Sequence, residues 1–250
     1  MNILACFILV TKTFTFCGVS WKTFDNFDPR SGNLFSSEMV KEASGGVSLI
    51  CKAEKKDSML TLYSAGIISQ RTFYYGTFVF DIEGGLTDLV HSCFAPFLYD
   101  YSSGEYEVDI EFSRWGNPSN FPGNYGIIRQ YGKWNKPDSV IRNVQKFNFS
   151  LRGRRKLTRH LIRWYPDSLV FESYSISRKR LRPLYRWKVT EKQWIPSKPL
   201  NVEVYLWWPS KPDRASTCEV KLVRFEYIKP DSSFYKNFLP SASQIPEIGK

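Results

Sequence analysis

Short apolar segments recur every 10 to 15 residues along this chain, separated by residues that favour turns. None of the segments keeps a helical period for long. Many short strands with Gly, Pro, Asn, Asp and Ser between them are typical of an antiparallel β-sandwich or jelly roll. We therefore predict an all-β fold with strands within residues 47–51, 59–63, 73–82, 89–100, 104–115, 125–131, 157–164, 168–175, 201–208 and 218–228.

The 250 residues show no internal repeat and no linker between two halves of different composition. We expect one domain over residues 21–230, preceded by a signal-like leader over residues 1–20 and followed by an extended tail over residues 231–250. The leader is suggested by the apolar run Ile3–Val10. No other segment approaches the ~18 apolar residues that a membrane span requires, so we predict no membrane span.

The chain is basic, with 35 Lys and Arg against 24 Asp and Glu and a net charge of +11. Two runs, over residues 152–156 and 178–182, carry much of this charge. Such a balance permits binding to nucleic acid, anionic lipid or acidic polysaccharide but demands none of them. Solvated loops or strand ends explain the runs best, and we expect no nucleic-acid partner.

Cysteine and histidine provide no framework for a metal site. The five cysteines, at positions 6, 17, 51, 93 and 218, are widely spaced, and the chain has only two histidines. Neither a disulfide pattern nor a CxxC metal pair is present, and free thiols are the expectation. The sequence also lacks a GxSxG elbow, a phosphate-binding P-loop and a dinucleotide fingerprint.

The stretch GEYEVDIEFSRW, residues 104–115, alternates between apolar and acidic side chains. As a strand it places Glu105, Glu107, Asp109 and Glu111 on one face. Neighbouring carboxylates on that face would lie roughly 7 Å apart and repel each other by about 2 kcal/mol per pair at a dielectric near 20. A folded chain gains nothing from this repulsion, so the row needs an explanation.

Three explanations compete for these acids. An ordinary solvated strand face is the simplest, although the repulsion counts against it. A calcium site is the second, but calcium loops draw their ligands from turns rather than from a straight strand. The third is cleavage of a glycosidic bond, which in a retaining enzyme requires two carboxyl groups about 5–5.5 Å apart. Mutual repulsion would raise the pKa of one carboxyl, which then serves as proton donor.

Glu107-Val-Asp109-Ile-Glu111 resembles the ExDxE signature of glycoside hydrolase family 16, the laminarinase and lichenase group. Segments on either side are also similar to that family, in the same order: 63–83, 94–101, 160–171, 202–209 and 219–230. The similarity spans roughly Trp21 to Pro230. It implies a concanavalin A-like jelly roll in which a concave sheet forms the cleft.

The resemblance implies a retaining endo-glycanase that cleaves β-1,3 or mixed-linkage glucan, with Glu107 as nucleophile, Asp109 as its supporting carboxylate and Glu111 as general acid/base. A non-catalytic, lectin-like carbohydrate-binding module is the alternative. The resemblance adds Asn33 as a contact to substrate, and Trp115 and Trp207 are candidates for stacking on sugar rings. No cofactor is implied, while a structural calcium ion stays open. We expect a monomer that is secreted or periplasmic.

Two departures from the family pattern concern the substrate. Tyr205 stands where the family often has Asn, and Arg129 stands near the place of a Gln. A sulfated glycan is a variant of the same hypothesis, in which Arg114, Arg129 or the run at 152–156 would meet the anionic groups.

Overall fold

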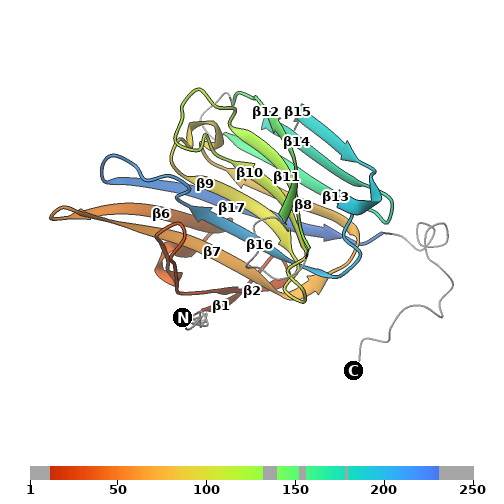
Figure 1. The fold of residues 1–250 in the computed structure, drawn as a ribbon, viewed down its shortest axis with the longest axis horizontal. Coiled ribbons are helices and arrows are strands. Elements are labelled where there is room, and N and C mark those ends of the chain that lie inside the picture. Colours follow the sequence, from red (N-terminus) through yellow and green to blue (C-terminus); the bar gives the residue numbers. More distant parts are fainter. Residues whose placement is uncertain (1–11, 132–139, 152–155, 178–179, 231–250) are drawn as a thin grey trace.

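The computed structural model describes residues 12–131, 140–151, 156–177 and 180–230. Two antiparallel sheets pack face to face, and one long strand, β7 (Met59–Phe73), takes part in both (Figure 1). The predicted all-β sandwich is therefore confirmed. No helix within these ranges is long and apolar enough to cross a membrane.

One sheet, called here the front sheet, has the strand order β1–β2–β7–β16–β9–β10–β11–β12. Besides β7, its strands are β1 (Thr13–Phe16), β2 (Val19–Thr23), β9 (Cys93–Tyr99), β10 (Tyr106–Phe112), β11 (Gly123–Gln130), β12 (Val140–Phe147) and β16 (Leu200–Trp207).

The other, the back sheet, has the order β5–β6–β17–β8–β13–β14–β15. These strands are β5 (Val40–Ala43), β6 (Gly46–Lys56), β8 (Gly76–Glu83), β13 (Leu157–Trp164), β14 (Leu169–Ser177), β15 (Arg180–Val189) and β17 (Ser216–Ile228). Two short strands, β3 (Asn26–Asp28) and β4 (Asn33–Phe35), pair with each other, and β4 lies parallel to β7. Three 3₁₀ turns, Ser37–Met39, Leu86–Asp88 and Lys192–Trp194, complete the described elements.

The core lies between the two sheets and is rich in aromatic side chains. Alternation along β10 turns Val108, Ile110 and Phe112 inward, where all three are fully buried. The back sheet contributes Phe80 and Phe171, which are equally buried. Since removal of a buried Phe costs about 3–5 kcal/mol, this packing holds β10 firmly and fixes the direction of its outward side chains.

Strands of the front sheet are already present before residue 21, the predicted start of the domain. Residues 12–20, which we assigned to a leader, include β1 and the first two residues of β2. These strands pair with each other, and β2 also pairs with β7. Phe14 and Val19 are buried in the core. The apolar character of this segment thus reflects sheet packing. The rest of the predicted leader, residues 1–11, and the predicted tail, residues 231–250, lie outside the described residues.

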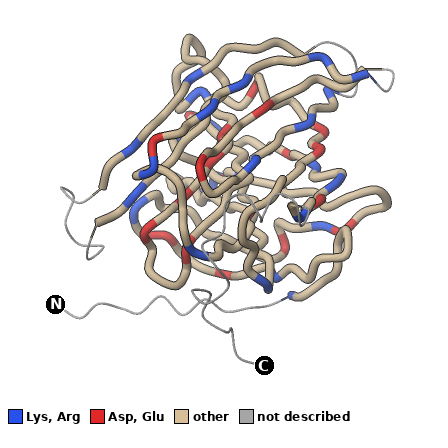
Figure 2. Tube along the Cα trace, turned by 90° about the vertical axis from the view of Figure 1, so that its right-hand side faces the viewer, with Lys and Arg blue, Asp and Glu red and all other residues tan. Residues whose placement is uncertain are grey.

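Only parts of the two basic runs are described. In the first run, Lys156 forms an ion pair with Asp88, and residues 152–155 lie outside the described ranges. In the second, residues 180–182 begin β15 and are exposed, and residues 178–179 are outside. Figure 2 shows basic and acidic positions interspersed along the strands in that view.

Candidate active site

Three acidic side chains leave β10 on the same side of the front sheet. Glu107, Asp109 and Glu111 alternate with the three inward residues of the strand, so they share the outer face. Glu107 and Glu111 are partly exposed, whereas Asp109 between them is 3% exposed. The arrangement gives two accessible carboxyl groups on either side of a buried one.

Burial raises the pKa of each acid, and repulsion from neighbouring carboxylates adds to this for Glu107 and Asp109. The pKa of Glu107 rises from 4.5 to about 7, because of burial first and the charge of Glu111 second. The pKa of Asp109 is raised well above its ordinary value by burial and by both neighbouring glutamates. A hydrogen bond between Asp109 and Glu107 lowers the pKa of Glu107 and raises that of Asp109. These opposite shifts favour Asp109 as the donor and Glu107 as the acceptor of their hydrogen bond.

Glu111 has a more polar environment than Asp109. Burial raises its pKa, but a hydrogen bond from Asn124 and the charge of Arg142 partly offset this. The Asn124 Nδ2 atom lies 3.3 Å from Glu111 Oε2. Asn124 and Arg142 come from β11 and β12, the two strands beyond β10 at the edge of the front sheet. Arg142 also lowers the pKa of Glu107.

A fourth carboxyl group, Glu203 of β16, joins the acidic face from across the sheet. Glu203 and Asp109 are both opposite Phe97 of β9, on its two sides, so the three side chains share one face. Glu203 is 1% exposed, and burial raises its pKa to about 7, with a further contribution from the charge of Glu107. Sequence reasoning missed this residue, because VEVYLW alternates like any strand and only the register brings Glu203 beside the acids.

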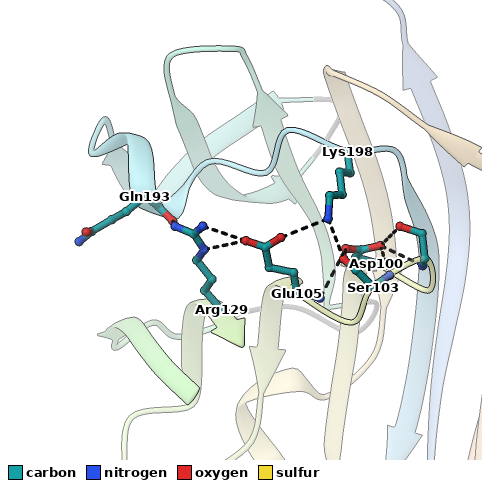
Figure 3. Close-up of polar contacts among 7 residues, drawn as sticks. Asp100, Ser103, Glu105, Arg129, Gln193 and Lys198 are labelled. Atoms are coloured by element: carbon teal, nitrogen blue, oxygen red, sulfur yellow. Dashed lines mark hydrogen bonds and ion pairs between the residues drawn. The ribbon is translucent and has the colours of Figure 1, made fainter. Parts of the chain in front are cut away.

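Glu105, in contrast, does not belong to the row. It precedes β10, and its carboxylate accepts hydrogen bonds from Arg129 at 2.8 and 3.0 Å and from Lys198 at 3.2 Å (Figure 3). The predicted row of four acids on β10 is therefore a row of three. Of those three, Glu107 and Glu111 are partly exposed and have raised pKa values. Such a pair is suited to nucleophilic and acid/base chemistry.

Two tryptophans meet beside the acidic face. Trp207 is at the end of β16, opposite Cys93 of β9. Cys93 is near the acids, since the charges of Glu111 and Asp109 add to burial in raising the pKa of its thiol. Trp115 follows β10, and its ring lies 6.1 Å from that of Trp207 in a T-shaped arrangement. The structure thus brings both predicted stacking residues together next to the acids.

The backbone holds Trp115 in an unusual conformation. Its φ of 53° is in the left-handed region, which a bulky residue rarely adopts. Arg114 secures the same loop by donating hydrogen bonds to the carbonyl oxygens of Thr87, Pro118 and Asn120. At 40% exposure the Trp115 ring stays open to solvent. Strain of this kind is commonly retained where a side chain has a function.

No protein-family model matches the sequence, and no curated protein matches it significantly. Solved structures do match. A β-glucanase from Bacillus licheniformis aligns with a TM-score of 0.61 at 16% identity, over 88% of this chain and 99% of that one. A family 16 endo-glucanase from Bacteroides ovatus, solved with a bound ligand, gives 0.62 at 12% identity over 86% and 97%. A β-1,3-glucanase from Mycobacterium marinum gives 0.56 at 15% identity over 80% and 83%.

The chain has the fold of family 16 glycoside hydrolases. The jelly roll expected from the ExDxE resemblance is thereby confirmed, and the ExDxE segment is on an exposed face of that fold as β10.

Where the family often has Asn, Tyr205 packs its ring among aromatic side chains. Its centroid lies 4.9–5.5 Å from those of Phe97, Phe35 and Phe24. Tyr205 and Trp207 form one side of a cavity of about 330 Å³, which is also lined by Phe24, Asn26, Phe27, Asp28, Pro29 and Phe35. Tyr205 therefore presents an aromatic ring beside Trp207, and its side chain also hydrogen-bonds Glu203.

Asn33 lies inside the fold, and its contact with a substrate stays a prediction. It is fully buried, and its side chain is saturated by protein partners. Its Nδ2 donates to the Trp208 carbonyl at 2.9 Å, and its Oδ1 accepts from the Trp208 amide at 3.0 Å and from the Ser64 hydroxyl. Asn33 therefore fixes the backbone that immediately follows Trp207.

The arginines considered for anionic groups are also occupied. Arg129 is opposite Tyr106, on the inner side of the alternation, and bonds Glu105 and the Gln193 carbonyl (Figure 3). Arg114 is bound to backbone carbonyls, as described above. Exposed cations beside the acids come instead from β12, where Arg142 and Lys146 are in register with Ile128 and Asn124 of β11.

Within the described ranges, no group of three His, Cys, Asp or Glu side chains is arranged to hold a metal ion. His160 is structural: it is fully buried, its ring nitrogens lie 2.7 and 2.8 Å from the Ser173 and Thr158 hydroxyls, and burial lowers its pKa to about 3. A structural calcium ion stays a prediction.

Proposed function

We propose that this chain is a retaining, endo-acting glycoside hydrolase that cleaves β-glycosidic bonds in a polysaccharide, with β-1,3 or mixed-linkage glucan as the favoured substrate. The observation that carries the proposal is the trio Glu107, Asp109 and Glu111, aligned on one outward face with raised pKa values. The solved structures of the same fold that are named as β-glucanases support the choice of substrate.

In the first step, the Glu107 carboxylate attacks the anomeric carbon while Glu111 donates its proton to the departing glycosidic oxygen. The C–O bond to the leaving sugar breaks, and a glycosyl ester of Glu107 forms. In the second step, Glu111 accepts a proton from water. The resulting nucleophile attacks the anomeric carbon and releases Glu107 as a carboxylate, with net retention of configuration.

Asp109 acts on Glu107 in this scheme. As a neutral acid it donates a hydrogen bond to the nucleophile, which orients that carboxylate and keeps part of it ionised despite its burial. The proton on Asp109 also limits the negative charge of the trio. Without it, three carboxylates in a row would make ionisation of Glu107 more costly.

The aromatic side chains supply binding energy. Trp115 and Trp207 offer ring faces for stacking on sugars, and the cavity lined by Trp207 and Tyr205 extends the apolar surface away from the acids. Arg142 and Lys146 on β12 favour a test of anionic glycans as well, because both are exposed next to the acidic trio.

The experiment is a panel of β-glucans and sulfated or carboxylated polysaccharides, with reducing ends and product lengths measured. The parent should release oligosaccharides from one of them. Glu107→Gln should lower kcat by more than about 1000-fold. Glu105→Gln should leave kcat unchanged, because Glu105, two residues earlier in the chain, is bonded to Arg129. Full activity in Glu107→Gln would refute the assignment of the nucleophile. Binding without new reducing ends would favour the lectin-like alternative.

Two further expectations belong to this proposal. Export, as a secreted or periplasmic protein, follows from the polymeric substrate and can be tested by fractionation of the producing cells. A monomer is expected, and sedimentation of the purified chain tests it.

A further inference from the structure

Two cysteines that are far apart in the sequence are direct partners in the back sheet. Cys51 of β6 and Cys218 of β17 are opposite each other in the antiparallel register. Both are free thiols. Side chains of directly opposed residues leave a sheet on the same face, and here that face is the inner one, because Cys51 is fully buried in the core and Cys218 packs partly buried against it.

The backbone spacing of such a pair suits a disulfide bond. Directly opposed residues of antiparallel strands have Cα atoms about 4.5 or 5.5 Å apart, depending on their place in the hydrogen-bond pattern. Disulfides span Cα separations of about 4.4–6.8 Å. Both values are within this range, so the two strands need not move apart or together for the sulfur atoms to bond.

The two thiols differ in reactivity. A hydrogen bond with Cys51 lowers the pKa of Cys218, although burial opposes this. Burial and the same neighbour raise the pKa of Cys51. Because Cys218 is also the more exposed of the two, it is the thiol that a soluble reagent meets first. Thiolate character and access both favour reaction at Cys218.

We propose that Cys51 and Cys218 form an intramolecular disulfide that crosslinks β6 and β17 when the chain meets a disulfide oxidant. The Cys218 thiolate attacks one sulfur of the oxidant, and the other sulfur leaves as a thiolate. The Cys51 thiolate then attacks Cys218 Sγ and expels the second thiolate of the oxidant. The protein loses two protons and two electrons, and the oxidant gains the electrons and becomes two thiols.

The crosslink would enclose most of the molecule. The chain between Cys51 and Cys218 contains β7, β9, β10, β11, β12 and β16, which are all strands of the front sheet except β1 and β2. Closing so long a loop restricts the unfolded chain strongly. We expect the bond to raise the thermal midpoint by about 5–15 °C.

The test uses the folded full chain with Cys6→Ser and Cys17→Ser, which leaves Cys51, Cys93 and Cys218. It is equilibrated in buffers of oxidised and reduced glutathione, then alkylated and digested with trypsin. Peptides 42–52 and 215–221 should be recovered joined by a disulfide, with a total mass two hydrogens below that of the separate thiol peptides. Cys93, buried in the front sheet, should stay a free thiol and thus reports that the chain remained folded.

Matched variants complete the design. Cys218→Ser and Cys51→Ala should each abolish the joined peptide and the rise in midpoint, and a reductant should remove both from the parent. The proposal is overturned if Cys51 and Cys218 stay free or carry glutathione singly in oxidising buffer. It is overturned equally if the joined peptide forms only after denaturation, or if the crosslinked chain melts no higher than the reduced chain.

Discussion

Asp109 and Glu203 flank the same residue, Phe97, from the two strands that border β9. Both carboxyl groups are almost fully buried, and burial raises the pKa of each. The front sheet therefore places two buried acids with raised pKa values on the same face as the more exposed Glu107 and Glu111. The order of residues within β10 or β16 does not indicate this arrangement, because it arises only from the register of β10, β9 and β16.

Glu203 should make stability depend on pH. Its pKa rises from 4.5 to about 7 on folding, so its ionisation is less favourable in the folded chain than in the unfolded chain. This cost is absent well below pH 4.5 and complete above pH 7. Glu203→Gln removes it, and the variant should gain about 3 kcal/mol relative to the parent on going from pH 4 to pH 8. Urea unfolding at both pH values measures the change.

The exposed carboxyl of Glu219 on β17 provides the control. Glu219→Gln should alter the free energy of unfolding by a small amount at both pH values. A Glu203→Gln variant whose difference from the parent is the same at pH 4 and pH 8 would contradict the assigned pKa.

Asn124 and Arg142 should move the pH profile of kcat/KM in different ways. Asn124 lowers the pKa of Glu111, so Asn124→Ala should shift only the limb that Glu111 sets, and toward higher pH. Arg142 lowers the pKa of both Glu107 and Glu111. Arg142→Gln should therefore shift both limbs upward on the polysaccharide that the panel identifies.

Lys146→Gln serves as the matched control for Arg142, since Lys146 is exposed on the same side of β12. It should leave both limbs in place. If Asn124→Ala and Arg142→Gln change the profile in the same way, the two limbs cannot be assigned one to Glu107 and the other to Glu111.

The ion-pair cluster of Figure 3 should stabilise the chain without taking part in chemistry. Burial alone would raise the pKa of Glu105, but hydrogen bonds from Arg129 and Lys198 outweigh it and lower that pKa. The stabilisation is present above the ordinary pKa of a glutamate and disappears as pH falls through the lowered value. Glu105→Gln should cost about 1 kcal/mol at pH 7.

Thermal unfolding at pH 7 and pH 3 measures this effect, and the two chains should converge at the lower pH. Reducing-end release by Glu105→Gln at pH 7 should match that of the parent. A large loss of activity with unchanged stability would place Glu105 in the reacting centre instead.

Ten strands were predictable because each has an apolar face that is visible in the sequence. β12 and β15 were missed for a physical reason: their exposed positions carry charged residues such as Arg142, Lys146, Arg180 and Arg182, so the segments resemble solvated loops. β1 was missed because its apolar residues resemble part of a leader. The local sequence pattern therefore predicts a strand only where that strand has a clearly buried face.

The site was predictable in part for a related reason. Glu107, Asp109 and Glu111 are on one strand, so alternation alone places them together. Glu203, Arg142 and the pair Cys51–Cys218 arise from contacts between strands distant in sequence. Register is a property of the whole sheet, and no spacing within a single segment reveals it.

Asn33 should affect substrate binding through Trp207 rather than by contact. Asn33→Ala removes both hydrogen bonds to the Trp208 backbone and should lower the free energy of unfolding by about 1–3 kcal/mol. With that backbone loosened, Trp207 loses its fixed place, so KM should rise in the direction seen for Trp207→Ala while kcat changes little. Ser64→Ala removes only the hydrogen bond between Ser64 and Asn33; it should cost stability and leave KM unchanged. If the KM values of Asn33→Ala and Ser64→Ala were equal, the proposed effect of Asn33 on substrate binding through Trp207 would be wrong.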